Sequence, residues 1–396
     1  MPPEGRTPYR NAFINKPQFL TLVQKFMKRA IGLIIGIVVS VVCFAYSMKG
    51  TSLADLRAGF QQANYLTLPL MLAMLFGFYW LKAMRWSWLL KPVTSLTTRR
   101  LFPPLLIGFA ANNILPAHLG EFVRVFVVRK QHQVPFSTVF STVVLERIFD
   151  VVAILGLFSV GLMFTSDLPD DYRRNALFLA AGCVFVVICV AIYLIWTDWF
   201  LRLTERVIGW VPFIPEALTG KILDMLRAGA HGLAALRSGR AVFLIMLNSI
   251  AQWLLNGLLA YTALRAFHVP VTPSAGLIIT GVIAIGVTIP SSPGYFGVIQ
   301  YCFAISMAAQ GLDIDPSLVL GASLYYHISM YIPVTVLGVH YLHSVGMRVS
   351  DLIKVGEDSA DQETPGQAMN GEQPETHDQT ENRSAVSQTG SPLDSL

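Results

Sequence analysis

Ionisable residues inside apolar stretches are the side chains of this sequence best suited to chemistry. Glu121 and Arg124 are three residues apart, and Glu146, Arg147 and Asp150 stand together in a later apolar stretch. On a helix, residues three or four apart face the same side. A charge that faces lipid costs at least about 2.5–3.5 kcal/mol, so we expect these side chains to face the protein interior or a water-filled path.

Two interpretations of these charges stay open. They contact an anionic headgroup, most directly through Arg124 or Arg147, because planar guanidinium donors match phosphate oxygens. Alternatively, they are architectural ion pairs that lock a helical hairpin to the helix that follows it.

Two apolar stretches, at about 101–130 and 274–310, are interrupted in the middle by proline and glycine. The interrupting residues are Leu115-Pro116 with Gly120 in the first, and Pro290, Pro293, Gly294 and Gly297 in the second. Each stretch predicts two half-helices joined by a break, with a fresh helix of about ten residues after it. At membrane depth an unsatisfied backbone group costs several kcal/mol, so such breaks must lie against protein or a wet cavity.

The two breaks have similar surroundings. Aligning Pro116 with Pro290 also aligns Gly120 with Gly294, and the long helix after each break carries polar residues, including Tyr326-His327 in the second half. A lone histidine in an apolar helix is most often a hydrogen-bonded packing residue, but its place in the repeat makes His327 a candidate, with Gln300 as its partner. Broken helices in corresponding positions are typical of inverted-repeat transporters with a binding site near the midplane.

The composition defines the class of protein that must position these residues. The 396 residues are 54% hydrophobic and 13% charged, whereas soluble domains carry about 25% charged residues. This excludes a soluble enzyme, a disordered protein and a nucleic-acid binder. We predict an all-α, polytopic integral membrane protein with two re-entrant hairpins in an inverted repeat and about six full spans. The spans are expected at about 31–48, 66–84, 136–165, 175–197, 241–266 and 317–343.

The distribution of basic residues predicts the orientation. Residues 1–30 carry six basic residues and form a cytoplasmic segment, and the 85–100 loop is basic through Arg85, Lys91, Arg99 and Arg100. If 101–130 is re-entrant, the basic, amphipathic segment 198–240 is also cytoplasmic, as an interfacial helix or a plain loop. The two hairpins then enter from opposite faces. Both termini are expected in the cytoplasm, at the bacterial inner membrane.

The remaining features outline the domains. A transmembrane domain covers 31–345, and 350–396 is expected to be a disordered, acidic cytoplasmic tail. The tail from residue 351 holds ten acidic and two basic residues, so the residues before it carry a net charge of +13. The four cysteines lie in apolar stretches without metal-binding or disulfide spacing. Gly32 and Gly36 form a G-x-x-x-G, which is either a packing motif or a chance match.

Three segments, in this order, resemble the transmembrane, flippase-like family of lysylphosphatidylglycerol synthases, including its stand-alone members. They are N-N-I-L-P-A-H-L-G-E-F-V-R at 112–124, V-V-L-E-R-I-F-D at 143–150 and I-P-S-S-P-G-Y-F-G-V-I-Q at 289–300. The resemblance covers roughly residues 20–345. It implies an inner-membrane protein that moves or presents phospholipids or lipid-linked molecules between leaflets.

The motifs and their surroundings give the candidate substrate-binding residues. These are Asn113, Pro116, Gly120, Glu121, Arg124, Glu146, Arg147, Asp150, Pro290, Ser292, Pro293, Gly294, Gln300 and His327. In the synthase branch the last two positions often hold an acidic residue and an arginine, so this sequence is more similar to the stand-alone branch. The 46 residues after Ser350 are too few for an aminoacyl-transferase domain, and we expect no lysyl transfer.

The leading hypothesis is a lipid-translocating or lipid-binding transporter whose partners are membrane lipids with anionic headgroups. An alternative is a membrane transferase that uses Glu121, Glu146 or Asp150 as a base, or an accessory subunit of a lipid-modifying enzyme encoded nearby. A scaffold acting through the tail is a third. Because the sequence has no serine elbow or nucleotide loop, we expect no enzyme activity and no catalytic residue. We also expect no metal, no cofactor and no nucleic-acid partner.

Overall fold

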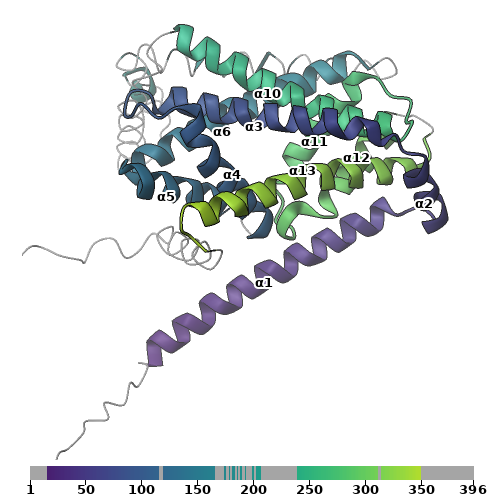
Figure 1. Ribbon diagram of the computed structural model, residues 1–396, viewed down its shortest axis with the longest axis horizontal. Coiled ribbons are helices and arrows are strands. Elements are labelled where there is room, and N and C mark those ends of the chain that lie inside the picture. Colours follow the sequence, from purple (N-terminus) through teal and green to yellow (C-terminus); the bar gives the residue numbers. More distant parts are fainter. Residues whose placement is uncertain are drawn as a thin grey trace, which may run out of the picture.

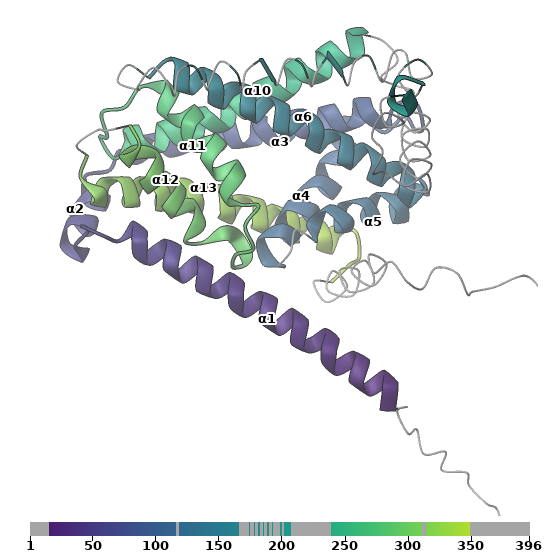
Figure 2. The ribbon, with the colours of Figure 1, turned by 180° about the vertical axis from the view of Figure 1, so that it is seen from behind.

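The computed structural model describes residues 16–115, 119–165, 239–310 and 314–348, together with scattered residues between 174 and 206 (Figures 1 and 2). Regular structure in these residues is entirely helical. The helices are α1 (Lys16–Ser47), α2 (Leu53–Gln62), η1 (Tyr65–Thr67), α3 (Leu68–Leu90), α4 (Thr98–Ile114), α5 (Gly120–His132), α6 (Phe136–Met163), α10 (Gly239–Ala266), α11 (Pro273–Gly286), η3 (Pro293–Tyr295), α12 (Val298–Ala308) and α13 (Pro316–Ser344).

The expected helices are present where the structure describes them. Four predicted spans correspond to α3, α6, α10 and α13, and both interrupted stretches are broken, between α4 and α5 and between α11 and α12. The helix after the first break, α5, has 13 residues, and the helix after the second break, α12, has 11. The tail lies outside the described residues. Of the span at 175–197 only scattered residues are described, and of 198–240 the described helical residues include 202–206.

Two boundaries differ from the prediction. α1 begins at Lys16 and so reaches into the segment predicted as an N-terminal extension. α3 continues to Leu90, well beyond the expected end near residue 84, because Arg85 is buried by protein and needs no water. Placing Arg85 in a cytoplasmic loop was therefore wrong, and Lys91, Arg99 and Arg100 alone carry the basic charge of that connection.

Length and apolar composition qualify two of the described helical stretches to cross a membrane, Tyr65–Leu90 and Gly239–Ala266. α6 has 28 residues, but any part of it long enough to span a bilayer includes Glu146, Arg147 and Asp150. Because of these three charges, α6 does not meet the criteria of length and apolar composition for a membrane-spanning helix. The total of six spans stays a prediction.

The helices fall into two sets with the same order, long, short, short, long. These are α3 to α6 and α10 to α13. α3 packs against α10, and the first short helix of each set packs against the last long helix of the other, α4 on α13 and α11 on α6 (Figures 1 and 2). Corresponding helices therefore make corresponding contacts across the bundle.

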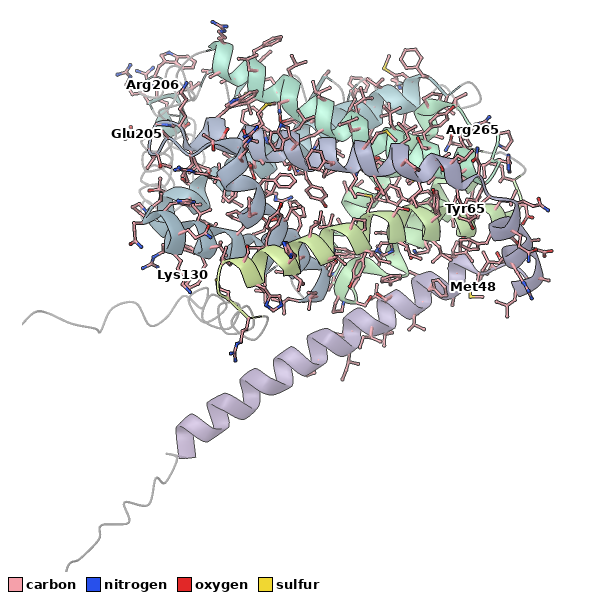
Figure 3. The ribbon with its side chains drawn as sticks, in the orientation of Figure 1. Met48, Tyr65, Lys130, Glu205, Arg206 and Arg265 are labelled. Carbon is pink, nitrogen blue, oxygen red and sulfur yellow. The ribbon has the colours of Figure 1, made fainter. Side chains whose placement is uncertain are left out.

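The two hairpins open toward opposite ends of the bundle. Lys130, near the end of α5, lies at one end with Glu205 and Arg206, whereas Arg265 and Tyr65 lie at the other (Figure 3). α11 starts a few residues after Arg265. A hydrogen bond from the Asn64 backbone N–H to the Ala266 carbonyl (2.8 Å) fastens the second end.

Close backbone contact holds α4 and α5 together. A Cβ atom on Gly108 would lie 2.7 Å from the carbonyl oxygen of Gly120. The Gly120 backbone N–H donates to Oδ1 of Asn112 (2.7 Å), which gives the start of α5 an acceptor. At the open end, burial and then the positive charge of Arg100 lower the pKa of His132, so the start of α4 and the end of α5 are neighbours.

α1 packs on the second break through small residues. A Cβ on Gly36 would lie 2.7 Å from the Ser291 carbonyl oxygen, and Gly32 has nothing within 4 Å. One turn later, Ser40 Oγ donates to Ser292 Oγ and accepts from the Ser292 backbone N–H, both at 2.9 Å. The small residues that pack here are therefore Gly36 and Ser40, one helical turn along from the pair of Gly32 and Gly36 that the sequence left as a packing motif or a chance match.

Substituting Gly36→Val should displace α1 from the second break, because the new side chain meets backbone. Cysteines at positions 40 and 292, in a chain with its native cysteines changed to alanine, should form a disulfide readily. We expect Gly36→Val to reduce this crosslinking several-fold while the control Gly32→Val leaves it unchanged. Equal crosslinking in the two variants would contradict the described contact.

Candidate functional site

Seven charged side chains from three helices form one network inside the bundle. α3 contributes two cations, and α5 and α6 contribute the residues singled out in the sequence. The members are Lys82, Arg85, Glu121, Arg124, Glu146, Arg147 and Asp150. Spacings of three or four residues put Lys82 with Arg85, Glu121 with Arg124, and Asp150 with both Glu146 and Arg147.

Arg124 joins α5 to α6. Its Nη1 donates to Oε2 of Glu146 (2.8 Å), and its Nη2 lies 2.6 Å from Oε2 of Glu121 without hydrogen-bond alignment. The guanidinium also lies over the ring of Trp86, 5.0 Å from its centroid. Arg147 completes this half by donating to Glu121 Oε1. Breaking the pair of Arg124 and Glu146 would leave a buried charge without its partner.

Asp150 is the centre of the other half. Lys82 Nζ donates to Oδ2 (3.1 Å), and Arg85 Nη1 donates to Oδ1 (2.8 Å). The indole N–H of Trp253, on α10, also donates to Oδ1 (2.8 Å). Arg147 Nη1 lies 3.9 Å from Oδ2. One carboxylate thus connects α3, α6 and α10.

Counted over the residues that the structure describes, the network contains one more cation than carboxylates. Its four cations, two from α3 and one each from α5 and α6, face three carboxylates, which leaves a formal charge of +1. The surplus lies around Asp150, where Lys82, Arg85 and Arg147 share one carboxylate. Such a site favours an anion.

Exposure separates the two arginines that the sequence left as alternatives. The side chain of Arg124 is 2% exposed and that of Arg147 is 44% exposed. Arg124 therefore has the geometry of the architectural interpretation, whereas Arg147 is open to a ligand.

The second break is supported by side chains of neighbouring helices. Gln300 Nε2 lies 3.2 Å from Nδ1 of His327, as expected for partners, and His327 Nε2 lies 2.8 Å from the carbonyl oxygen of Gly294. The Gly297 backbone N–H donates to Gln300 Oε1 (2.7 Å). Gly294 and Gly297 have φ values of 75° and 86°, which glycine adopts without strain.

The two breaks meet at α13. The hydroxyl of Tyr331 donates to the carbonyl oxygen of Asn113 (3.4 Å), and Asn113 Nδ2 donates to Thr335 Oγ1 (2.8 Å). A Cβ on Gly294 would lie 3.4 Å from the same Asn113 oxygen. Residues from the two breaks, about 180 positions apart, are thus neighbours in space.

Tyr295 links the second break to the charge network, because its hydroxyl lies within electrostatic range of Arg147. The other candidates are less central. Ser292 and Pro293 are partly buried, and Pro290 is exposed. Pro116 lies outside the described residues.

Sequence reasoning missed both α3 cations and the α10 donors. Lys82 and Arg85 are three residues apart in an apolar run, the same signal that identified Glu121 and Arg124. Because the predicted span ended near residue 84, Arg85 was assigned to the following loop and its spacing from Lys82 was overlooked. Nothing in the local sequence marks Trp253 or Ser249 as a site residue, because their roles depend on contacts with residues of other helices. Among the described residues, no group of three or more His, Cys, Asp and Glu side chains could hold a metal.

Residues 33–338 match the family model described as the lysylphosphatidylglycerol synthase TM region. The chain belongs to this family. As a member of the lysylphosphatidylglycerol synthase TM family it is a membrane protein, and its all-helical structure agrees with that assignment.

Two archaeal proteins are similar to this chain in sequence. It is 25% identical over 289 residues to "Glycosyltransferase AglD" of Haloferax volcanii, covering 65% of this chain and 45% of that protein. It is 22% identical over 337 residues to a UPF0104 membrane protein of Methanothermobacter thermautotrophicus, covering 80% and 96%. The chain therefore spans less than half of AglD and nearly all of the second relative. No solved structure matches it.

Asp150→Asn should destabilise the protein strongly, because Lys82 and Arg85 would keep their charges in a buried site without a carboxylate. We expect a loss of about 3–5 kcal/mol, seen as a lower melting temperature in detergent by fluorescence-detected size exclusion. Glu205→Gln, at an exposed position, is the matched control. A melting temperature equal to that of the control would show that Asp150 does not hold the helices together.

Proposed function

We propose that this protein binds or translocates a phospholipid or lipid-linked molecule across the membrane, with an anionic headgroup held in the polar region between the two breaks and its tails left in the bilayer. The observation that carries the proposal is the surplus positive charge of a largely buried network whose most exposed cation is Arg147. A buried surplus cation favours an anionic ligand.

The arrangement of the helices supports a transport role. We propose that the two hairpins are re-entrant and enter from opposite membrane faces, as their opposite open ends suggest (Figure 3). In an inverted repeat of this kind, the broken helices meet near the midplane and surround the substrate. Contact between the breaks at Asn113 and Gly294 is consistent with that geometry.

The same geometry supports the proposed orientation. The end of the bundle that includes Lys130 and Arg206 also holds the basic start of α4, with Arg99 and Arg100. By the positive-inside rule this end is cytoplasmic. Since α13 runs away from the end that holds Arg265, the tail also starts on the cytoplasmic side, and we place the protein in the plasma membrane.

An accessory or transferase role in modifying lipid-linked molecules is the second candidate. Similarity to a protein named a glycosyltransferase favours it, although the chain covers 45% of that relative. The carboxylates argue against a direct chemical role. Glu121, Glu146 and Asp150 are each paired with a cation, so a proton on any of them would leave a buried cation without its counter-charge.

Reconstitution with labelled anionic and zwitterionic lipids tests the transport proposal. We expect the wild type to accelerate leaflet exchange of anionic lipid and Arg147→Ala to slow it about tenfold or more, the effect of losing a charge-assisted hydrogen bond. Arg206→Ala, which removes an exposed arginine, should exchange lipid like the wild type. Equal exchange by the wild type, Arg147→Ala and protein-free vesicles would overturn the proposal.

Arg124→Ala separates structure from binding. Because Arg124 is buried and paired with Glu146, its loss should lower the yield of folded protein. Arg147→Ala should preserve folding and affect exchange. The ratio of exchange rate to folded protein therefore distinguishes the two arginines.

A further inference from the structure

Arg85 has hydrogen-bond donors that no described residue uses. Its side chain is 0% exposed. Nη1 donates to Asp150 Oδ1 (2.8 Å) and to Ser249 Oγ (2.6 Å). Nε and Nη2 have no hydrogen-bond partner in the described part of the chain. A buried charged group with unused donors is unfavourable unless an acceptor is supplied.

The unused donors have a specific geometry. Nε and Nη2 lie on one edge of the planar guanidinium, and their N–H groups form a fork that accepts two oxygens of one ligand. This bidentate arrangement is the one by which arginine binds phosphate and carboxylate.

The side chains that contact Asp150 are donors, and no described acceptor bonds to Nε or Nη2 of Arg85. Lys82 Nζ, Arg85 Nη1 and the Trp253 indole N–H all donate to Asp150. Ser249 uses its own hydroxyl proton on the Ile245 carbonyl (2.8 Å). A ligand at this place must therefore bring acceptor oxygens, which excludes a cation or an amine.

The charge balance points to the same class of ligand. The network has a surplus of +1, and the surplus lies at Asp150, beside Arg85. A phosphodiester carries one negative charge and two unsubstituted oxygens. It would neutralise the surplus and fill the fork.

We propose that the Nε and Nη2 edge of Arg85 is a buried phosphate subsite, with Lys82 supplying the charge that the carboxylates do not balance. The ligand is a phosphate group, from a lipid headgroup or from free phosphate. For the lipid, this inference rests on the proposed function. The exposed Arg147, near Oδ2 of Asp150, then makes the outer contact, and the buried Arg85, bonded to Oδ1, makes the inner one.

Binding by the purified full-length protein tests the subsite. The probes are short-chain phosphatidylglycerol, inorganic phosphate and short-chain diacylglycerol, which lacks the phosphate. Arg85→Lys keeps the charge beside Asp150 and removes the fork, so we expect it to weaken binding of the phosphate probe at least tenfold. Arg206→Lys makes the same chemical change at an exposed site and should bind like the wild type.

The three probes identify the source of the phosphate. Binding of phosphatidylglycerol alone assigns a lipid headgroup, and binding of inorganic phosphate assigns the free ion. Binding of diacylglycerol as tight as that of phosphatidylglycerol would overturn the subsite, as would wild-type affinity for both phosphate probes in Arg85→Lys.

A second variant keeps the test decisive if Arg85→Lys fails to fold. Lys82→Gln makes the network neutral while leaving the pair of Arg85 and Asp150 intact, and it should also weaken phosphate binding. Unchanged affinity in Lys82→Gln would overturn the proposal. If the protein exchanges lipid but its phosphate binding does not depend on Arg85, the subsite is wrong and the transport function stands. If binding depends on Arg85 but no lipid is exchanged, the subsite stands and the transport function is wrong.

Discussion

The buried carboxylate of Asp150 is the interaction on which the arrangement of the long helices depends. It accepts hydrogen bonds from Lys82 and Arg85 on α3 and from Trp253 on α10. Since unpaired charge in a low-dielectric interior is costly, α3 and α10 cannot move away from α6 independently. Arg124 imposes the same condition on α5, through Glu146. The charges therefore fix how four helices meet.

The breaks follow a related rule for backbone groups. In a bilayer, a peptide group outside a helix must find its partner within the protein. Asn112 supplies an acceptor for the start of α5, and Gln300 and His327 serve the backbone of Gly297 and Gly294. Side chains from both halves of the chain thus make the breaks tolerable. A rearrangement of one break would disturb the other through α13.

The charge network and the second helix break are connected through Tyr295. Tyr295 belongs to the second break and lies in electrostatic range of Arg147, the exposed cation of the network. An anion arriving at Arg147 would change the charge that Tyr295 and Asp150 experience. Binding of an anion and the backbone conformation of the second break would therefore influence each other. Family membership shows that the chain is a membrane protein.

The sequence by itself determined the membrane class, the helix breaks and the grouping of Glu121 with Arg124 and of Glu146 with Asp150. These depend on composition, on proline and glycine, and on helical spacing, all of which are local. The tertiary structure decided which residues complete the site. Arg85 is buried against Asp150 of α6 and Ser249 of α10, whereas the side chain of Arg147 is 44% exposed. Burial is set by distant segments, so spacing alone could not separate Arg124 from Arg147 or bring Lys82 to Asp150.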